Sequence, residues 1–252
     1  MKRSLIITLL MAFVAIASVQ AQVKVVAHRG YWKTDGSAQN SLTSLTKADA
    51  IGCFGSEFDV WLTADDNLVV DHDRTFKGVN MEESDLKTIR TITLDNGEQL
   101  PTLDEYLQRG KELNTRLVLE MKPLGDLNRE DLAVNKIIQA LLKYKVLDRT
   151  DIISFSLNAC IEFRKALPDT KVYYLDGDLA PAKIKALGLA GVDYSMAAMR
   201  QHPEWTEECH KLGLEVNVWT VDKEEDLRYF IGQGVDIITT NEPELLQRIL
   251  KE

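Results

Sequence analysis

The sequence predicts an α/β fold, a (β/α)8 barrel, because short β-branched and apolar runs alternate eight times with amphipathic helical patterns after residue 22. Several of the runs are apolar at nearly every position, which is typical of parallel strands buried on both faces. An open, doubly wound sheet is the alternative, but the count of eight and the lack of a Gly-x-Gly-x-x-Gly turn favour the barrel. The expected strands are Val23–Ala27, Ser56–Thr63, Leu117–Met121, Asp151–Ser156, Lys171–Leu175, Val192–Ser195, Glu215–Thr220 and Asp236–Thr240.

The segments between these strands have the apolar spacing of surface helices. Pro203 and Pro243 stand at expected helix starts. The longest irregular region, Arg74–Pro101, is expected to be an excursion between the second strand and its helix. Four helical runs end at a glycine, where a left-handed residue stops a helix: Gly52, Gly188, Gly213 and Gly234. The expected helices are Asn40–Ile51, Leu103–Lys111, Glu130–Tyr144, Asn158–Leu167, Ala182–Leu187, Pro203–Leu212, Lys223–Gly232 and Glu242–Leu250.

Composition excludes several classes of protein. The 252 residues include 30 Lys and Arg against 39 Asp and Glu, a formal charge of −9. This acidic balance argues against a nucleic-acid partner and against docking on anionic membranes, both of which need clustered cations. The three cysteines, Cys53, Cys160 and Cys209, are too few and too scattered for a disulfide framework. We expect small core residues, with one bridge as the alternative.

The first 21 residues have the pattern of a secretory signal peptide. Lys2 and Arg3 precede an apolar run, Leu5–Ala17, and Val19-Gln20-Ala21 places small residues before a cleavage site. A transmembrane anchor is the alternative, but the run is shorter than the ~20 residues that a span requires. The sequence therefore predicts an exported protein, periplasmic or secreted, with a mature domain at residues 22–252 and no stable membrane anchor after cleavage.

Ionisable residues interrupt the apolar strands where the strands end. In an α/β barrel, the C-terminal strand ends and the loops after them carry the chemistry, so these residues are the candidates for a functional site. They are His28 and Arg29 after the first strand, Glu57 and Asp59 in the second, His72 beyond it, and Glu120 and Lys122 at the third. Trp219, at the end of the seventh strand, is an aromatic candidate in the same position.

The acidic candidates fit a metal site. Glu57 and Asp59 are two residues apart on one strand, so their side chains share a face, and Glu120 lies on the adjacent strand. Three carboxylates of this kind suit one hard divalent cation, Mg²⁺ or Ca²⁺. An internal salt-bridge cluster with Arg29 and Lys122 is the alternative, and spacing alone does not separate the two.

Two of the four histidines fall in the strand-end motifs. His28 and His72 could act as general acid and general base on opposite sides of a substrate. A hydrogen-bonded structural histidine is the alternative for each of them. His202 and His210 lie near the sixth helix, and we assign them no role.

Taken together, these motifs resemble the glycerophosphodiester phosphodiesterase family. The resemblance rests on five pieces in order and extends to the Gly234–Pro243 segment: His28-Arg29-Gly30, Glu57-x-Asp59, His72-Asp73, Glu120-x-Lys122 and Trp219-Thr220. The family is a TIM barrel, which agrees with the strand count. The resemblance implies metal-dependent hydrolysis of a small glycerophosphodiester to an alcohol and sn-glycerol 3-phosphate.

The resemblance also implies a role for each candidate residue. It makes His28 and His72 the acid/base pair. Arg29 and Lys122 match positive residues that face the phosphodiester. Trp219 matches an aromatic near the glycerol or alcohol portion, with simple core filling as the alternative. The metal-binding carboxylates of the family correspond to Glu57, Asp59 and Glu120.

One position departs from the family pattern. Many members have Pro-Glu-Asn where this chain has Ala38-Gln39-Asn40, so Gln39 replaces a charged residue. If that Glu orients Arg29 or supports the metal, this chain would hold its cation more weakly or use different supporting contacts. Two other readings stay open: a phosphodiesterase for lysophospholipids or another phosphodiester, and a phosphate-binding relative without catalysis. Oligomeric state is not predicted.

Overall fold

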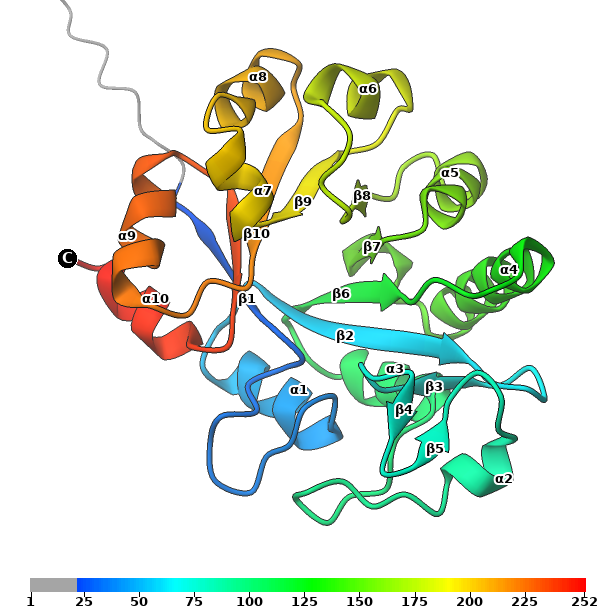
Figure 1. The fold of residues 1–252 in the computed structure, drawn as a ribbon. Coiled ribbons are helices and arrows are strands. Elements are labelled where there is room, and N and C mark those ends of the chain that lie inside the picture. The colour runs from blue at the N-terminus through cyan, green and yellow to red at the C-terminus, as the bar shows by residue number, and fades with distance from the viewer. Residues whose placement is uncertain (1–21) are drawn as a thin grey trace, which may run out of the picture.

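The computed structural model describes residues 22–252, which form a closed barrel of eight parallel strands surrounded by helices (Figure 1). The barrel closes where β1 (Lys24–Ala27) pairs with both β2 (Gly55–Leu62) and β11 (Ile237–Thr240). The signal peptide expected at residues 1–21 lies outside the described residues. Between β2 and β11 the strands follow in the order β6 (Arg116–Met121), β7 (Thr150–Ser154), β8 (Val172–Tyr174), β9 (Gly191–Ser195) and β10 (Glu215–Trp219).

The predicted barrel is confirmed, and each predicted strand ends within two residues of an observed one. The predicted helices also form, although α4 begins three residues before the expected Glu130. Within residues 22–252 no helix is long and apolar enough to cross a membrane. The helices between barrel strands are α1 (Leu42–Ala50), α3 (Leu103–Gly110), α4 (Leu127–Tyr144), α5 (Leu157–Ala166), α6 (Pro181–Ala186), α8 (Trp205–Lys211), α9 (Glu224–Gly232) and α10 (Pro243–Ile249).

Local chemistry explains most helix ends. A side-chain oxygen of Ser41 caps α1, and Thr102 and Glu105 form a capping box at α3. The prediction that Pro203 starts a helix is wrong: it lies in the turn between α7 (Met196–Gln201) and α8, where a residue without an N–H costs no helical hydrogen bond. The four glycines expected to end helices all have left-handed backbones, with φ between 69° and 75°.

The excursion after β2 is more ordered than the sequence predicts. β3 (Leu68–Val70) returns antiparallel to β2, and a small hairpin, β4 (Thr75–Phe76) and β5 (Val79–Asn80), follows with the short helix α2 (Leu86–Ile89). A short 3-10 helix, Leu147–Arg149, precedes β7. The excursion has its own apolar core, in which Trp61, Val69, Met81, Ile89 and Leu100 are buried. This core fixes the segment that carries His72 directly after β3.

The barrel interior is filled at its N-terminal end. Val26, Val118 and Ile237 belong to an inner apolar layer. Near this end the Glu215 carboxylate accepts hydrogen bonds from Lys24 Nζ at 3.0 Å, Lys171 Nζ at 2.6 Å and the Tyr173 hydroxyl. No side chain fits at Gly191, where a Cβ would lie 1.9 Å from the Glu215 backbone oxygen. The three cysteines are free and buried, as expected of core residues, without the alternative bridge.

Glu215 makes the stability of the barrel depend on pH. Burial alone raises the pKa of this carboxyl, but the hydrogen bonds from Lys171, Tyr173 and Lys24 outweigh it and lower the pKa to about 2. A depressed carboxyl pKa stabilises the fold at pH values above its unfolded pKa, and this contribution is lost as the pH falls towards the folded value.

We therefore expect Glu215→Gln to lower the free energy of unfolding at neutral pH by about 1–3 kcal/mol, because it removes charge-assisted hydrogen bonds. The difference from wild type should shrink as the pH falls from 4.5 towards about 2, which urea denaturation across the acid range measures. Glu112→Gln, which removes only an exposed pair with Arg109, is the control. A difference for Glu215→Gln that does not change with pH would contradict the assignment.

Candidate active site

A cavity of about 220 Å³ opens at the C-terminal end of the barrel, where the sequence places the chemistry. Asp59 and Lys122, from the same set of predicted site residues, are buried beside it. Six of the eight predicted site residues line this cavity: His28, Arg29, Glu57, His72, Glu120 and Trp219.

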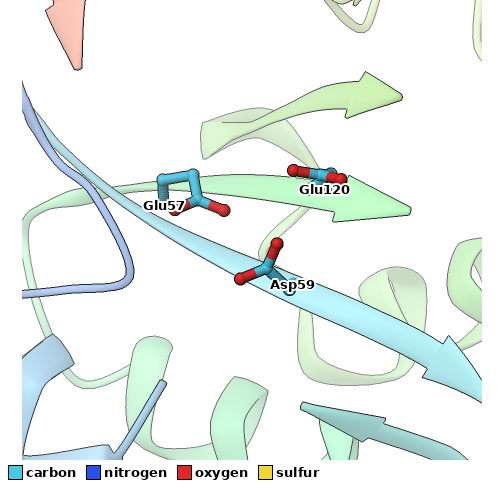
Figure 2. A group of neighbouring side chains, drawn as sticks. All are labelled: Glu57, Asp59 and Glu120. Atoms are coloured by element: carbon cyan, nitrogen blue, oxygen red, sulfur yellow. The ribbon is translucent and has the colours of Figure 1, made fainter. Parts of the chain in front are cut away.

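The three predicted carboxylates converge, as Figure 2 shows. Asp59 pairs in register with Glu120 on the neighbouring strand, and ligand oxygens of Glu57, Asp59 and Glu120 lie within 4.8 Å of one another. Their residues are 2%, 1% and 7% exposed. Glu57 Oε2 accepts the backbone N–H of Arg29 at 2.7 Å, whereas Glu57 Oε1 has no hydrogen-bond partner among residues 22–252.

Lys122 compensates part of this buried charge. Its ammonium lies 3.0 Å from Asp59 Oδ1 and 2.7 Å from Glu120 Oε1, so it contacts the carboxylates directly. Burial and the neighbouring acids raise the pKa of Glu57 and bring that of Glu120 to about 7. For Asp59, burial opposes ionisation, but Lys122 holds the pKa below its usual range. One ammonium against three carboxylates, with one oxygen unpaired, fits a site for a hard divalent cation.

Asn40 supports the same cluster, although it is not among the site residues that the sequence predicts. Its side-chain Nδ2 donates to Asp59 Oδ2 at 2.8 Å, and its Oδ1 accepts the Asp59 backbone N–H at 3.2 Å. Asn40 has a left-handed backbone with φ of 57°, a conformation that asparagine adopts more readily than most residues. The available signal was an asparagine at the start of the helix expected at Asn40–Ile51, directly before the Ser41 cap that the structure shows.

The tautomer of His28 follows from its partners. Asn241 Nδ2 donates to Asp222 Oδ2 at 2.8 Å, which orients the amide so that Asn241 Oδ1 accepts. Trp32 Nε1 donates to that oxygen at 2.9 Å, and His28 Nδ1 lies 2.9 Å from it. His28 Nδ1 therefore carries the hydrogen and Nε2 carries a lone pair. Burial, together with the charge of Arg29, lowers the pKa of His28 to about 4.

His72 lies in a different environment, directly after β3. Its Nδ1 is 2.7 Å from Asp73 Oδ1, so a carboxylate orients this ring where an amide orients His28. Burial lowers the pKa of His72, although the charge of Asp59 and the hydrogen bond with Asp73 favour the protonated form. Both histidines line the cavity, so they can reach one bound molecule.

Arg29 and Gly30 form the turn that carries the first motif. Both have left-handed backbones, with φ of 57° and 75°. A Cβ on Gly30 would lie 2.4 Å from Ser44 Oγ, so only glycine allows the loop to pack on α1. Arg29 Nη1 donates to Gln39 Oε1 at 2.6 Å, so Gln39 orients the guanidinium.

Trp219 is part of an apolar side of the cavity. Its ring packs edge-on against Phe155, with centroids 5.7 Å apart, and its Nε1 donates to the Asp193 backbone oxygen at 2.9 Å. The remaining histidines lie elsewhere: His202 stacks on Trp205, and His210 contacts Asp236.

Comparison with known proteins identifies the family. The Glycerophosphoryl diester phosphodiesterase family matches residues 28–245. The chain belongs to this family. A glycerophosphodiester phosphodiesterase of Caldanaerobacter subterraneus subsp. tengcongensis is 31% identical over 242 residues, which cover 90% of this chain and 98% of that protein. Membership makes the chain a phosphodiesterase, an enzyme of the hydrolase class.

Solved structures agree with the family assignment. A glycerophosphodiester phosphodiesterase from Parabacteroides distasonis is 45% identical and superposes with a TM-score of 0.91, covering 92% of this chain and 98% of its own. An Oleispira antarctica phosphodiesterase, in complex with sn-glycerol-3-phosphate, is 22% identical with a TM-score of 0.79 and shares the fold over 91% of this chain and 97% of its own. The barrel is thus that of the family.

The partners of His28 make a prediction that needs no substrate. In protein with ¹⁵N-labelled histidines, NMR should show His28 as the Nδ1–H tautomer, neutral until the pH falls to about 4. Asn241→Leu removes the oxygen that accepts from Nδ1, so a mixture of tautomers should replace the single form. Asn135→Leu, on the exposed face of α4, is the control. An Nε2–H tautomer in wild type would contradict this reading of the network.

Proposed function

We propose that the chain hydrolyses glycerophosphodiesters to an alcohol and sn-glycerol 3-phosphate, using His28 and His72 for proton transfer. The observation that supports this most is the single cavity that collects both histidines, Arg29 and two of the three clustered carboxylates. The bound product in the Oleispira antarctica structure supports the same chemistry by fold analogy. The N-terminal pattern leads us to propose export as well.

The two histidines suit opposite halves of the reaction. His28 is neutral at pH 7 with a lone pair on Nε2, so it is the base that removes the proton from the attacking oxygen. We assign His72 the role of the acid because its partner is a carboxylate: Asp73 favours the charged form of the ring, against the burial that lowers its pKa, as His72 donates to the departing alkoxide. Arg29, held by Gln39, faces the negative charge that builds on the non-bridging oxygens.

Glu57, Asp59 and Glu120 are the residues that would hold a cation. When bound, Mg²⁺ or Ca²⁺ supplies positive charge beside the phosphoryl oxygens. Lys122 keeps the Asp59 carboxylate ionised, and Asn40 holds it in place, so the chain's own residues keep this ligand ready. From this position Lys122 acts on the phosphodiester through the carboxylates that it contacts.

The lysophospholipid alternative lacks support from the surface. That function would need an apolar lip beside the barrel mouth. Among residues 22–252, the exposed large apolar side chains are Leu127 and Leu142, both on α4, and neither lines the cavity. A relative that only binds phosphate would be expected to lack a histidine or a carboxylate. In this chain both histidines line the cavity, and the three carboxylates lie close together.

The decisive assay is release of sn-glycerol 3-phosphate from glycerophosphocholine, glycerophosphoethanolamine, glycerophosphoglycerol and glycerophosphoinositol. We expect EDTA to abolish release and Mg²⁺ or Ca²⁺ to restore it. His28→Ala should lower turnover by about 10²- to 10⁴-fold, the usual contribution of general acid–base catalysis. His210→Ala, remote from the cavity, should retain activity. Release that is insensitive to EDTA, or that survives His28→Ala, would contradict the proposal.

Gln39 offers a separate test of metal binding. Gln39→Glu adds a negative charge beside Arg29, at the residue before Asn40, which bonds Asp59, so the cation should bind about three- to tenfold more tightly. The control is Gln99→Glu, which adds the same charge in the excursion, where Gln99 bonds Arg90. Titration calorimetry with Mg²⁺ and Ca²⁺ measures the affinity. If metal affinity and turnover both stay unchanged, Gln39 does not support the site.

A further inference from the structure

The cavity wall across the barrel from the carboxylate cluster contains one acidic residue that the mechanism does not use. This wall comes from β7 to β10 and is largely apolar, with Ile153, Phe155, Leu175 and Trp219 facing the cavity. Asp193, on β9, lies among them and is 1% exposed. Its Oδ1 is fully buried and has no hydrogen-bond partner among residues 22–252.

A buried carboxyl with an unpaired oxygen lowers the stability of the fold, so its presence needs an explanation. A buried polar atom without a partner loses its hydration and gains nothing in return. Asn217, opposite in the strand register, exchanges hydrogen bonds with Thr239 at 2.9 and 3.2 Å. Its amide is close enough to lower the pKa of Asp193, but it makes no hydrogen bond to Asp193 Oδ1. The indole of Trp219 bonds only the Asp193 backbone. An apolar residue like Ile153 or Leu175 would suit the fold better at this position.

A substrate can supply the missing partner. Arg29 and His72 line both the 220 Å³ cavity and a second, outer cavity of about 450 Å³. The outer cavity extends past Trp32 and Phe76 to the surface loops. A phosphodiester bound at Arg29 and His72 therefore places one substituent in each cavity. The small inner cavity suits the constant glycerol group, and the larger outer cavity suits the variable alcohol.

Glycerol matches the inner cavity in chemistry as well as size. Its carbon atoms can pack on the Phe155 and Trp219 rings, and its hydroxyls can donate to a carboxyl oxygen. Asp193 keeps acceptor lone pairs whether or not it is protonated, so the contact does not depend on its charge state. Three of the four strands of this wall thus carry apolar groups, and the fourth carries the hydrogen-bonding group.

We propose that Asp193 binds the free primary hydroxyl of the substrate's glycerol group and thereby selects unacylated glycerophosphodiesters. This inference rests on the proposed function and adds a specificity-determining residue to it. An acyl ester at that hydroxyl would remove the donor and press a chain against Ile153 and Leu175. The site would then reject lysophospholipids at the glycerol itself.

The test compares two substrates in three proteins. Wild type, Asp193→Ala and Asp193→Asn are assayed on glycerophosphocholine and on its analogue lacking only the primary hydroxyl. Wild type should prefer the natural substrate in kcat/KM by about 10- to 100-fold, the usual value of a hydrogen bond to a buried polar group. Asp193→Ala should lose most of that preference, because its activity falls on glycerophosphocholine and stays nearly unchanged on the analogue. Asp193→Asn, which retains an acceptor, should keep part of it.

Controls separate this inference from folding and from the proposed function. Asp151→Asn, which breaks an ion pair with Arg116 outside the cavity, should not change the preference. Thermal melts should show Asp193→Asn to be at least as stable as wild type. If the carboxyl instead stabilised the fold, the variant would be less stable. Equal losses on both substrates in Asp193→Ala, or a wild type without preference, would overturn the assignment.

A binding measurement tests the contact between Asp193 and the glycerol hydroxyl even if no turnover is detected. Calorimetry compares sn-glycerol 3-phosphate with its analogue lacking the primary hydroxyl, on wild type and on Asp193→Ala. A preference in wild type that Asp193→Ala abolishes supports the contact, and equal affinities overturn it. Absence of release from every glycerophosphodiester would instead count against the proposed function.

Discussion

Three carboxylates buried at one end of a parallel barrel are the constraint on which the rest of the site depends. Like charges in a dry interior raise one another's pKa, so the fold must provide donors around them. Lys122 and the Asn40 amide serve Asp59, and the Arg29 backbone N–H serves Glu57. Two of these donors come from residues with left-handed backbones, Arg29 and Asn40. The unusual conformation of the first loop is therefore a consequence of the acidic cluster it supports.

The two ends of the barrel differ in how many donors surround their buried carboxylates. At the N-terminal end Lys24, Lys171 and Tyr173 all donate hydrogen bonds to the Glu215 carboxylate, and these bonds lower its pKa. At the C-terminal end Glu57 and Glu120 have fewer donors than their burial demands, and their pKa rises. A buried carboxylate with a full set of donors stabilises the scaffold, whereas buried carboxylates with too few donors leave room for a cation or a substrate. The excursion after β2 has its own apolar core, which holds His72 at the C-terminal end of the barrel, beside these carboxylates.

Sequence periodicity was sufficient for the barrel, because parallel strands buried on both faces stand out as apolar runs between amphipathic helices. The strand-end rule pointed to eight candidate residues, six of which line one cavity. It could not reveal the contacts between distant segments: Asn241 lies 213 residues from His28, and no local pattern links the two. The pieces β3 to β5 and α7 were missed because they are too short for periodicity to show. The ammonium of Lys122 contacts carboxylates, a geometry that one-dimensional spacing leaves undetermined.

The acids of the cavity also show how environment separates roles within one site. Glu57, Asp59 and Glu120 lie close enough to share a cation, and they have Lys122 and Asn40 beside them. Asp193 stands alone in an apolar wall, where a single carboxyl cannot assemble the several oxygens that a divalent cation needs. Burial raises the pKa of Asp193 to about 8, so its neutral form predominates at pH 7. A neutral carboxyl pairs with a hydroxyl better than with an ammonium, which favours glycerol over a cationic headgroup as its partner.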